Sequence, residues 1–194
     1  MQRNGRTFAL AMLFESSLGF AGILIALWTG TPLYSRLEIT AEALRRGVLA
    51  SLPMFLFLGV VTMARWAPLV RLRRQVESLV RELFAESHWV EIAMISFAAG
   101  LGEEVLFRGA LQPWIASWTN PLFALCAVSV LFGLAHSIST IYFLVATLVG
   151  FYLGWLALAY DDLLAPILAH SLYDFFALVY LQRRVGLQRR VRRD

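Results

Sequence analysis

Residues 110–160 read ALQPWIASWTNPLFALCAVSVLFGLAHSISTIYFLVATLVGFYLGWLALAY and contain no Asp, Glu, Lys or Arg. A helix needs about 20 mostly apolar residues to cross roughly 30 Å of hydrocarbon. Polar and proline-containing breaks divide the stretch into a short helix, a span ending near His136 and a span from about Ile141 to Tyr160. The sequence therefore predicts membrane helices, and strands are not expected because barrel spans would be short and alternating.

The composition of the whole chain also indicates a membrane protein. Of the 194 residues, 59% are hydrophobic and 15% are charged, with a mean hydropathy of +0.68. Soluble domains have roughly 45–50% apolar and about 25% charged residues. The net charge of +4 comes from arginine, which favours loops facing anionic lipid over nucleic-acid binding. The single Cys126 excludes an intrachain disulfide and a Cys-based zinc site, and we expect it to be a small core residue.

Three further segments have the length and composition of a span. They are Phe8 to Trp28, which we interpret as an uncleaved anchor, Val48 to Trp66, and Leu163 to Leu181. A polar stretch from Thr31 to Gly47 separates the first two. Residues 68–88 combine charge with helical spacing of Val76, Leu79, Val80 and Leu83, and so predict an amphipathic helix at the membrane interface.

We therefore predict an all-α fold, a polytopic transmembrane bundle of about six to eight helices with one interfacial amphipathic helix. The expected organisation is N-terminal accessory helices over residues 1–88, a membrane domain over 89–182 that carries the candidate site, and a basic C-terminal tail over 183–194. The expected location is an integral, multi-pass position in the cell membrane, which is the inner membrane if the source is prokaryotic. The lipid bilayer is thus a partner, and nucleic acid is not.

The apolar segment from Trp89 ends in ionisable residues that hydropathy alone would not allow. Each such side chain in a span costs on the order of 2.5–3.5 kcal/mol and is a functional hypothesis until a partner explains it. Glu104 and Arg108 are four residues apart and can pair on one helix face, whereas Glu103 points about 100° away. One carboxylate is left over, and such a carboxylate suits a general base.

Two more helices bring ionisable groups into apolar surroundings. His136 follows Phe132 by four residues at the end of one span, and His170 and Asp174 share one face of the last span. Each group alone has a structural interpretation, as an interhelical hydrogen-bonding group or an ion pair. The three helices together favour a functional site. We interpret Glu15 and Glu91 as structural or interfacial, and Asp161 and Asp162 as a turn.

In this order and on successive helices, the motifs Glu103-Glu104-x-x-x-Arg108, Phe132-x-x-x-His136 and His170-x-x-x-Asp174 resemble the type II CAAX prenyl endopeptidase and bacteriocin-processing family, also called the Abi family. Its members are intramembrane glutamic endopeptidases. The resemblance covers about residues 89–180. It implies an enzyme that hydrolyses a peptide bond in or at the membrane without a metal or other cofactor.

Carried onto the matching positions, the resemblance implies that Glu103 activates a water with the help of His136. Glu104 and Arg108 are then the supporting pair, and His170 and position 174 stabilise the oxyanion. The best-known relatives have Asn where this chain has Asp174. An ionised Asp cannot donate a hydrogen bond to an oxyanion, so Asp174 is either protonated or only orients His170.

Other functions compete with the protease. Two carboxylates and two histidines could hold zinc or iron in a metal-dependent membrane hydrolase, with Glu103, His136 and His170 around one centre. A non-catalytic chaperone or immunity protein could use the same fold for binding. A transporter is a weaker option, since paired repeats are not evident. The partner of the protease would be a peptide or protein substrate in or at the membrane.

A geometric expectation follows from the protease interpretation. Glu103 and His136 lie at similar distances along their helices from Trp89 and Asn120. We expect both helices to start on one membrane face, with residues 110–118 carrying the chain back across as a short or broken helix. That arrangement would place the arginine tail opposite Arg71 to Arg81, against the positive-inside rule.

Overall fold

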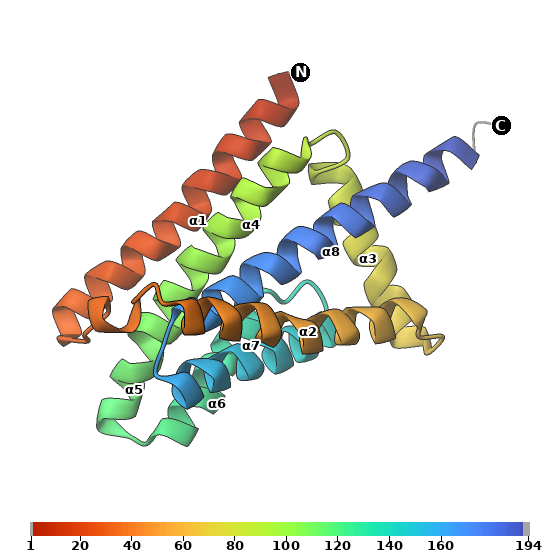
Figure 1. The fold of residues 1–194 in the computed structure, drawn as a ribbon. Coiled ribbons are helices and arrows are strands. Elements are labelled where there is room, and N and C mark those ends of the chain that lie inside the picture. Colours follow the sequence, from red (N-terminus) through yellow and green to blue (C-terminus); the bar gives the residue numbers. More distant parts are fainter. Residues whose placement is uncertain (1, 192–194) are drawn as a thin grey trace.

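The structure is a computed structural model that describes residues 2–191, and the side chains of residues 5–186. Across these residues it is helical and has no strand, which confirms the predicted all-α bundle. The elements are α1 (Gln2–Thr29), η1 (Tyr34–Arg36), α2 (Ala41–Met63), α3 (Ala67–Leu83), α4 (Trp89–Glu104), the π-helix η2 (Val105–Leu111), α5 (Gln112–Trp118), α6 (Pro121–Ala135), α7 (Thr140–Tyr160) and α8 (Leu164–Val191) (Figure 1). Helices α1, α2, α7 and α8 contain apolar stretches long enough to cross a membrane.

Local capping explains where several helices begin. The side chains of Thr40, Asn120 and Ser139 accept hydrogen bonds from the backbone N–H three residues later, at the starts of α2, α6 and α7. The cap at Thr40 starts α2 at Ala41, earlier than the predicted Val48. The first turns of α2 carry charge, because Glu42 pairs with two arginines on its own helix, and hydropathy alone did not include these turns in the span.

The segment that carries Glu103 runs in one direction to Trp118. Helix α4, the π-helix η2 and α5 follow one another without a break over residues 89–118, roughly 45 Å at 1.5 Å per residue. The expectation that residues 110–118 return across the membrane is therefore wrong. Glu103 lies in the middle of this long helical run, and α6 starts at its far end and comes back to the same depth (Figure 1).

Close backbone contacts fix how α1 and α8 lie against α4. Helix α1 is parallel to α4, with Gly19 beside Gly102 and Gly22 beside Leu106. Helix α8 is antiparallel to α4, with Ser171 packed against Gly100. Small residues allow such approaches in a membrane, where helix association depends on packing more than on the hydrophobic effect.

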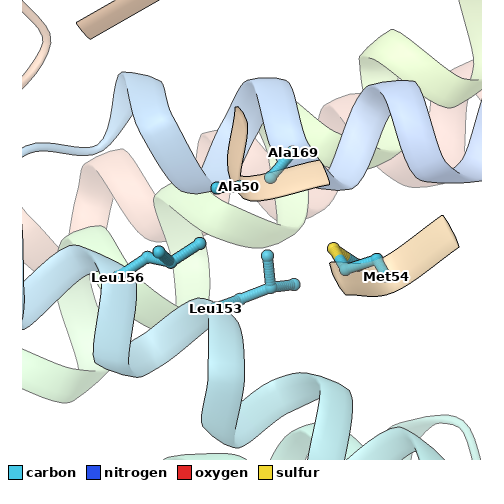
Figure 2. Close-up of a cluster of buried hydrophobic side chains, with 5 residues drawn as sticks. All are labelled: Ala50, Met54, Leu153, Leu156 and Ala169. Carbon is cyan, nitrogen blue, oxygen red and sulfur yellow. The ribbon is translucent and has the colours of Figure 1, made fainter. Parts of the chain in front are cut away.

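One core cluster joins α2, α7 and α8. Figure 2 shows Leu153 and Leu156 of α7 facing Ala50 and Met54 of α2 and Ala169 of α8, all of them buried. The two alanines leave room for the leucines, so the three helices pack closely. Tyr152 adds a hydrogen bond from its hydroxyl to the carbonyl oxygen of Ala50 at 2.8 Å.

At one end of the bundle, Arg36 joins three segments. It donates hydrogen bonds to the carbonyl oxygens of Arg108 and Ala157, both at 3.2 Å, and pairs with Asp161 at 3.2 Å. Burial lowers the pKa of Arg36 below its ordinary value, and Asp161 opposes that effect. The predicted turn is present: Asp161 ends α7 in the left-handed region, and Asp162 accepts from the backbone N–H of Leu164.

At the opposite end, α8 lies against α3 and the turn that follows it. Arg184 pairs with Glu77 at 3.1 Å, and Gln182 donates to the carbonyl oxygens of Phe84 and Ser87. The expected separation of the arginine tail from α3 is therefore wrong. That expectation depended on residues 110–118 crossing back through the membrane, which they do not do. Glu77 is one of the charged residues of the amphipathic helix α3, but it is buried against α8.

Two further predictions concern single segments. The tail over 183–194 is not separate from the last span, since α8 continues helically to Val191; residues 192–194 and the side chains beyond residue 186 lie outside the described part. Cys126 was predicted to be a core residue, and this is wrong because it is exposed on α6. A helix that is apolar on all sides has no periodic pattern that distinguishes the face toward lipid from the face packed against other helices.

Candidate active site

The first part of the site is a buried ion pair where α4 passes into the π-helix. Arg108 donates through Nη1 to Glu104 Oε1 at 3.0 Å and through Nη2 to the carbonyl oxygen of Gly150 on α7 at 2.7 Å. Neither side chain of the pair has any exposed surface. The pair predicted from spacing is present, although the segment around Arg108 is a π-helix instead of an α-helix. Such π-turns often occur at functional sites.

His170 on α8 contacts the same carboxylate. Its Nδ1 lies 2.8 Å from Glu104 Oε1. Glu104 already accepts from Arg108, and an ionised carboxylate only accepts hydrogen bonds, so His170 Nδ1 carries the hydrogen. The other ring nitrogen, Nε2, then faces Glu103 Oε2 at 3.9 Å and Asp174 Oδ2 at 3.4 Å.

His136 approaches Glu103 from the end of α6. Its Nδ1 lies 2.8 Å from the carbonyl oxygen of Phe132, which can only accept, so this nitrogen also carries the hydrogen. Its Nε2 lies 3.5 Å from Glu103 Oε1. The imidazole stacks on the Phe132 ring at 4.4 Å, and the Arg108 guanidinium lies 4.5 Å from the centre of the same ring.

These contacts give the two neighbouring glutamates different surroundings. The charge of Glu104 is matched by Arg108, while the two oxygens of Glu103 each face an imidazole Nε2. The separations of 3.5 and 3.9 Å are longer than a usual hydrogen bond, so both carboxylate oxygens lie beside an imidazole nitrogen without a short direct bond to it. Glu103 is 8% exposed, whereas His136 is 28% and Asp174 31% exposed, so the site opens on the side of the latter two.

The structure brings together every side chain singled out from the sequence for this site. They come from α4, η2, α6 and α8: Glu103, Glu104, Arg108, Phe132, His136, His170 and Asp174. No three His, Cys, Asp or Glu side chains within the described residues are arranged so that they could hold a metal ion. The coordination sphere of the metal-dependent alternative is therefore not formed in this arrangement.

One acidic side chain near the site was not predicted from the sequence. Glu15 of α1 lies within electrostatic range of Glu103, Asp174, His170 and His136, although it was interpreted as structural or interfacial. The signal that could have found it is its place inside an apolar span. Glu91, the other glutamate set aside, forms a capping box with His88 at the start of α4.

Fold and site together define a class: a helical membrane bundle with a buried Glu-Arg pair and a Glu-His cluster on three converging helices. A family model described as Type II CAAX prenyl endopeptidase Rce1-like matches residues 85–176. The matched segment runs from the turn before α4 into α8 and contains all seven residues above, so this part of the chain is similar to that family. Comparison with curated proteins gave no match, and comparison with solved structures gave none.

The family match has direct consequences for activity. It indicates a protease of the CAAX type, and hence a peptide substrate at the membrane. The long apolar helices agree with an integral membrane protein. Helices α1, α2 and α3 lie outside the matched segment.

Proposed function

We propose that this protein is an intramembrane glutamic endopeptidase that hydrolyses a membrane-anchored or membrane-embedded peptide with a water activated by Glu103. The observation that carries the proposal is the division of roles between the two adjacent carboxylates. Glu104 is occupied by Arg108 and His170, while Glu103 faces two imidazole nitrogens at 3.5 and 3.9 Å. A general base needs a carboxylate that is not held in an ion pair and lies within hydrogen-bond reach of the proton that it removes.

In the proposed first step, Glu103 removes a proton from a water held between its carboxylate and His136 Nε2. The resulting hydroxide attacks the carbonyl carbon of the scissile bond. The C–O bond forms while the carbonyl π electrons move to oxygen, which gives a tetrahedral oxyanion. His136 assists by orienting the water, since Phe132 fixes its ring by stacking and by the Nδ1 hydrogen bond.

In the second step, the proton taken by Glu103 passes to the leaving nitrogen, and the C–N bond breaks to give a carboxylic acid and an amine. The acid then passes its proton to the amine, which leaves a carboxylate and an ammonium group. We assign oxyanion stabilisation to His170, which donates through Nε2 when the ring carries both hydrogens. Asp174 lies 3.4 Å from that nitrogen. It can accept from His170 but, when ionised, cannot donate to the oxyanion, so we assign it the role of orienting His170.

The remaining residues keep the reacting groups in place. Arg108 donates hydrogen bonds to Glu104 and to the carbonyl oxygen of Gly150, and His170 is hydrogen-bonded to Glu104. The ion pair therefore links α4, η2, α7 and α8. A site on several packed helices holds its geometry better than one on loops. We propose that residues 89–182 form the catalytic domain and that α1 to α3 are accessory.

The test is cleavage of an internally quenched, prenylated CAAX peptide by the purified protein in liposomes. Glu103→Ala should abolish hydrolysis and leave the thermal unfolding midpoint unchanged, because the Glu104–Arg108 pair remains. Glu82→Ala, at an exposed position on α3, is the control and should retain full activity. Full activity of Glu103→Ala would end the glutamic-protease proposal.

A second arm of the same assay concerns metals. We expect EDTA and phenanthroline to leave the wild-type rate unchanged. Inhibition by a chelator that added zinc reverses would move the protein to the metal-dependent class of hydrolases.

A further inference from the structure

An apolar groove of about 910 Å³ lies between α1, the loop after it and α4. Its walls include Gly19 and Ile23 from α1, and Phe97 and Ala98 from α4. Glu15 is the one charged residue of this α1–α4 groove, within the part of the chain whose side chains are described. The groove lies outside the Glu-His cluster, since none of the residues of that cluster lines it.

Glu15 connects the groove to the site. Helix α1 touches α4 at Gly102, the residue before Glu103, so closely that a Cβ at Gly102 would collide with the carbonyl oxygen of Glu15. The side chain of Glu15 lies within electrostatic range of Glu103, His136 and Asp174. Its Oε2 is buried and has no hydrogen-bond partner.

A peptide to be cleaved inside a membrane needs such an acceptor. Its scissile segment must leave the helical state to be attacked, and this exposes backbone N–H groups that the bilayer core cannot satisfy. Each unsatisfied group costs several kcal/mol in hydrocarbon. The walls of the α1–α4 groove are almost entirely apolar, so they suit apolar side chains and offer the backbone few partners other than Glu15.

We propose that the α1–α4 groove binds the extended apolar segment of the peptide substrate, and that Glu15 accepts a hydrogen bond from a backbone N–H of that segment beside Glu103. This inference rests on the proposed function, because it places the substrate of that same site. It gives α1, which the family match does not cover, a direct part in substrate binding.

The first experiment measures binding without cleavage. A fluorescent prenylated CAAX peptide is titrated against the inactive Glu103→Gln protein in nanodiscs, and anisotropy reports the Kd. Adding Glu15→Leu should weaken binding about tenfold, because the hydrogen bond to the carboxyl oxygen is lost. Glu15→Gln keeps a carbonyl acceptor at the same place and should stay within about threefold of the parent protein.

A matched pair of variants tests the groove itself. Ala98→Phe fills it and should weaken binding by about tenfold or more, while Ala9→Phe, at an exposed position on α1 outside the groove, should change nothing. Equal affinity for Ala98→Phe and Ala9→Phe overturns the proposal, and so does the absence of saturable binding. A groove filled by lipid alone would give that result.

Kinetics with Glu103 present separate this inference from the proposed function. Glu15→Leu should raise KM about tenfold and leave kcat within about twofold. A loss of kcat with KM unchanged would overturn the binding role of Glu15. If cleavage depends on Glu103 but the groove variants have no effect, the inference fails and the proposed function stands. If the peptide binds in the groove but the protein with Glu103 does not cleave it, the proposed function fails and binding in the groove stands.

Discussion

Glu104 has no exposed surface and accepts hydrogen bonds from two other buried side chains. Arg108 donates to it from the π-helix and His170 from α8, both onto the same oxygen. Arg108 itself cannot lose its charge, so its burial depends on this carboxylate. Glu104 is thus a structural requirement of the site, whatever its neighbour Glu103 does in the reaction.

We predict that Glu104→Ala lowers both activity and stability. The substitution leaves Arg108 buried without its partner, a change that typically costs about 3–5 kcal/mol. The thermal midpoint in detergent, followed by tryptophan fluorescence, should fall clearly, whereas Glu103→Ala should leave it unchanged. Equal midpoints for the two variants would contradict the division of roles between the glutamates.

Phe132 supports two groups of the site at once. Its ring stacks on His136 at 4.4 Å and lies under the Arg108 guanidinium. Phe132→Leu should reduce kcat more than tenfold with little change in KM, because the imidazole loses the surface that orients it. Phe123→Leu, at an exposed position on the same helix, is the control. A normal kcat for Phe132→Leu would show that the backbone hydrogen bond alone orients His136.

Among the elements, α1 depends on glycine for its contact with the π-helix η2. A Cβ at Gly22 would lie 2.8 Å from the backbone N and Cα of Leu106, at the start of the π-helix. Backbone atoms cannot move aside as a flexible side chain can. Any larger residue at this position therefore pushes α1 away from η2.

We predict that Gly22→Ala lowers the thermal midpoint and reduces activity, since it displaces α1 and with it Glu15. The comparison is Gly59→Ala on α2, where a Cβ meets nothing within 4 Å. That variant should be neutral or slightly stabilising, because alanine favours helix more than glycine does. The idea of a tight α1–η2 contact is wrong if the two variants behave alike in the same assay.

For the whole molecule, the arrangement of the helices collects arginine at one end of the bundle. The start of α1, helix α3 and the described end of α8 lie at that end (Figure 1), and Arg184 meets Glu77 there. The loop after α1 and the α7–α8 turn lie at the other end, joined by Arg36 and Asp161. From the positive-inside rule we predict that the α3 end faces the cytoplasm.

This orientation can be measured by cysteine labelling after Cys126 is replaced by Ser. In right-side-out vesicles, a membrane-impermeant maleimide should label Ser35→Cys and should reach Gln75→Cys only after permeabilisation. Both positions are exposed, one in η1 and one on α3. Labelling of both variants from the outside would contradict the proposed orientation.

The sequence by itself determined the helical membrane class, the approximate spans and the Glu104–Arg108 pair. These features depend on local properties: the length of an apolar run, and the spacing that puts residues four apart on one face. Charged first turns, such as that of α2, were lost from the predicted span because hydropathy averages over the whole window.

Only the tertiary structure decided the unbroken run from α4 to α5, the exposure of Cys126, the burial of Glu77 and the position of Glu15 beside the site. Each of these depends on which helix lies next to which, and in which direction. Close backbone approaches at glycines and ion pairs between helices determine that choice, and both join residues far apart in the chain. Hydropathy and periodicity describe one helix at a time and contain no information about such neighbours.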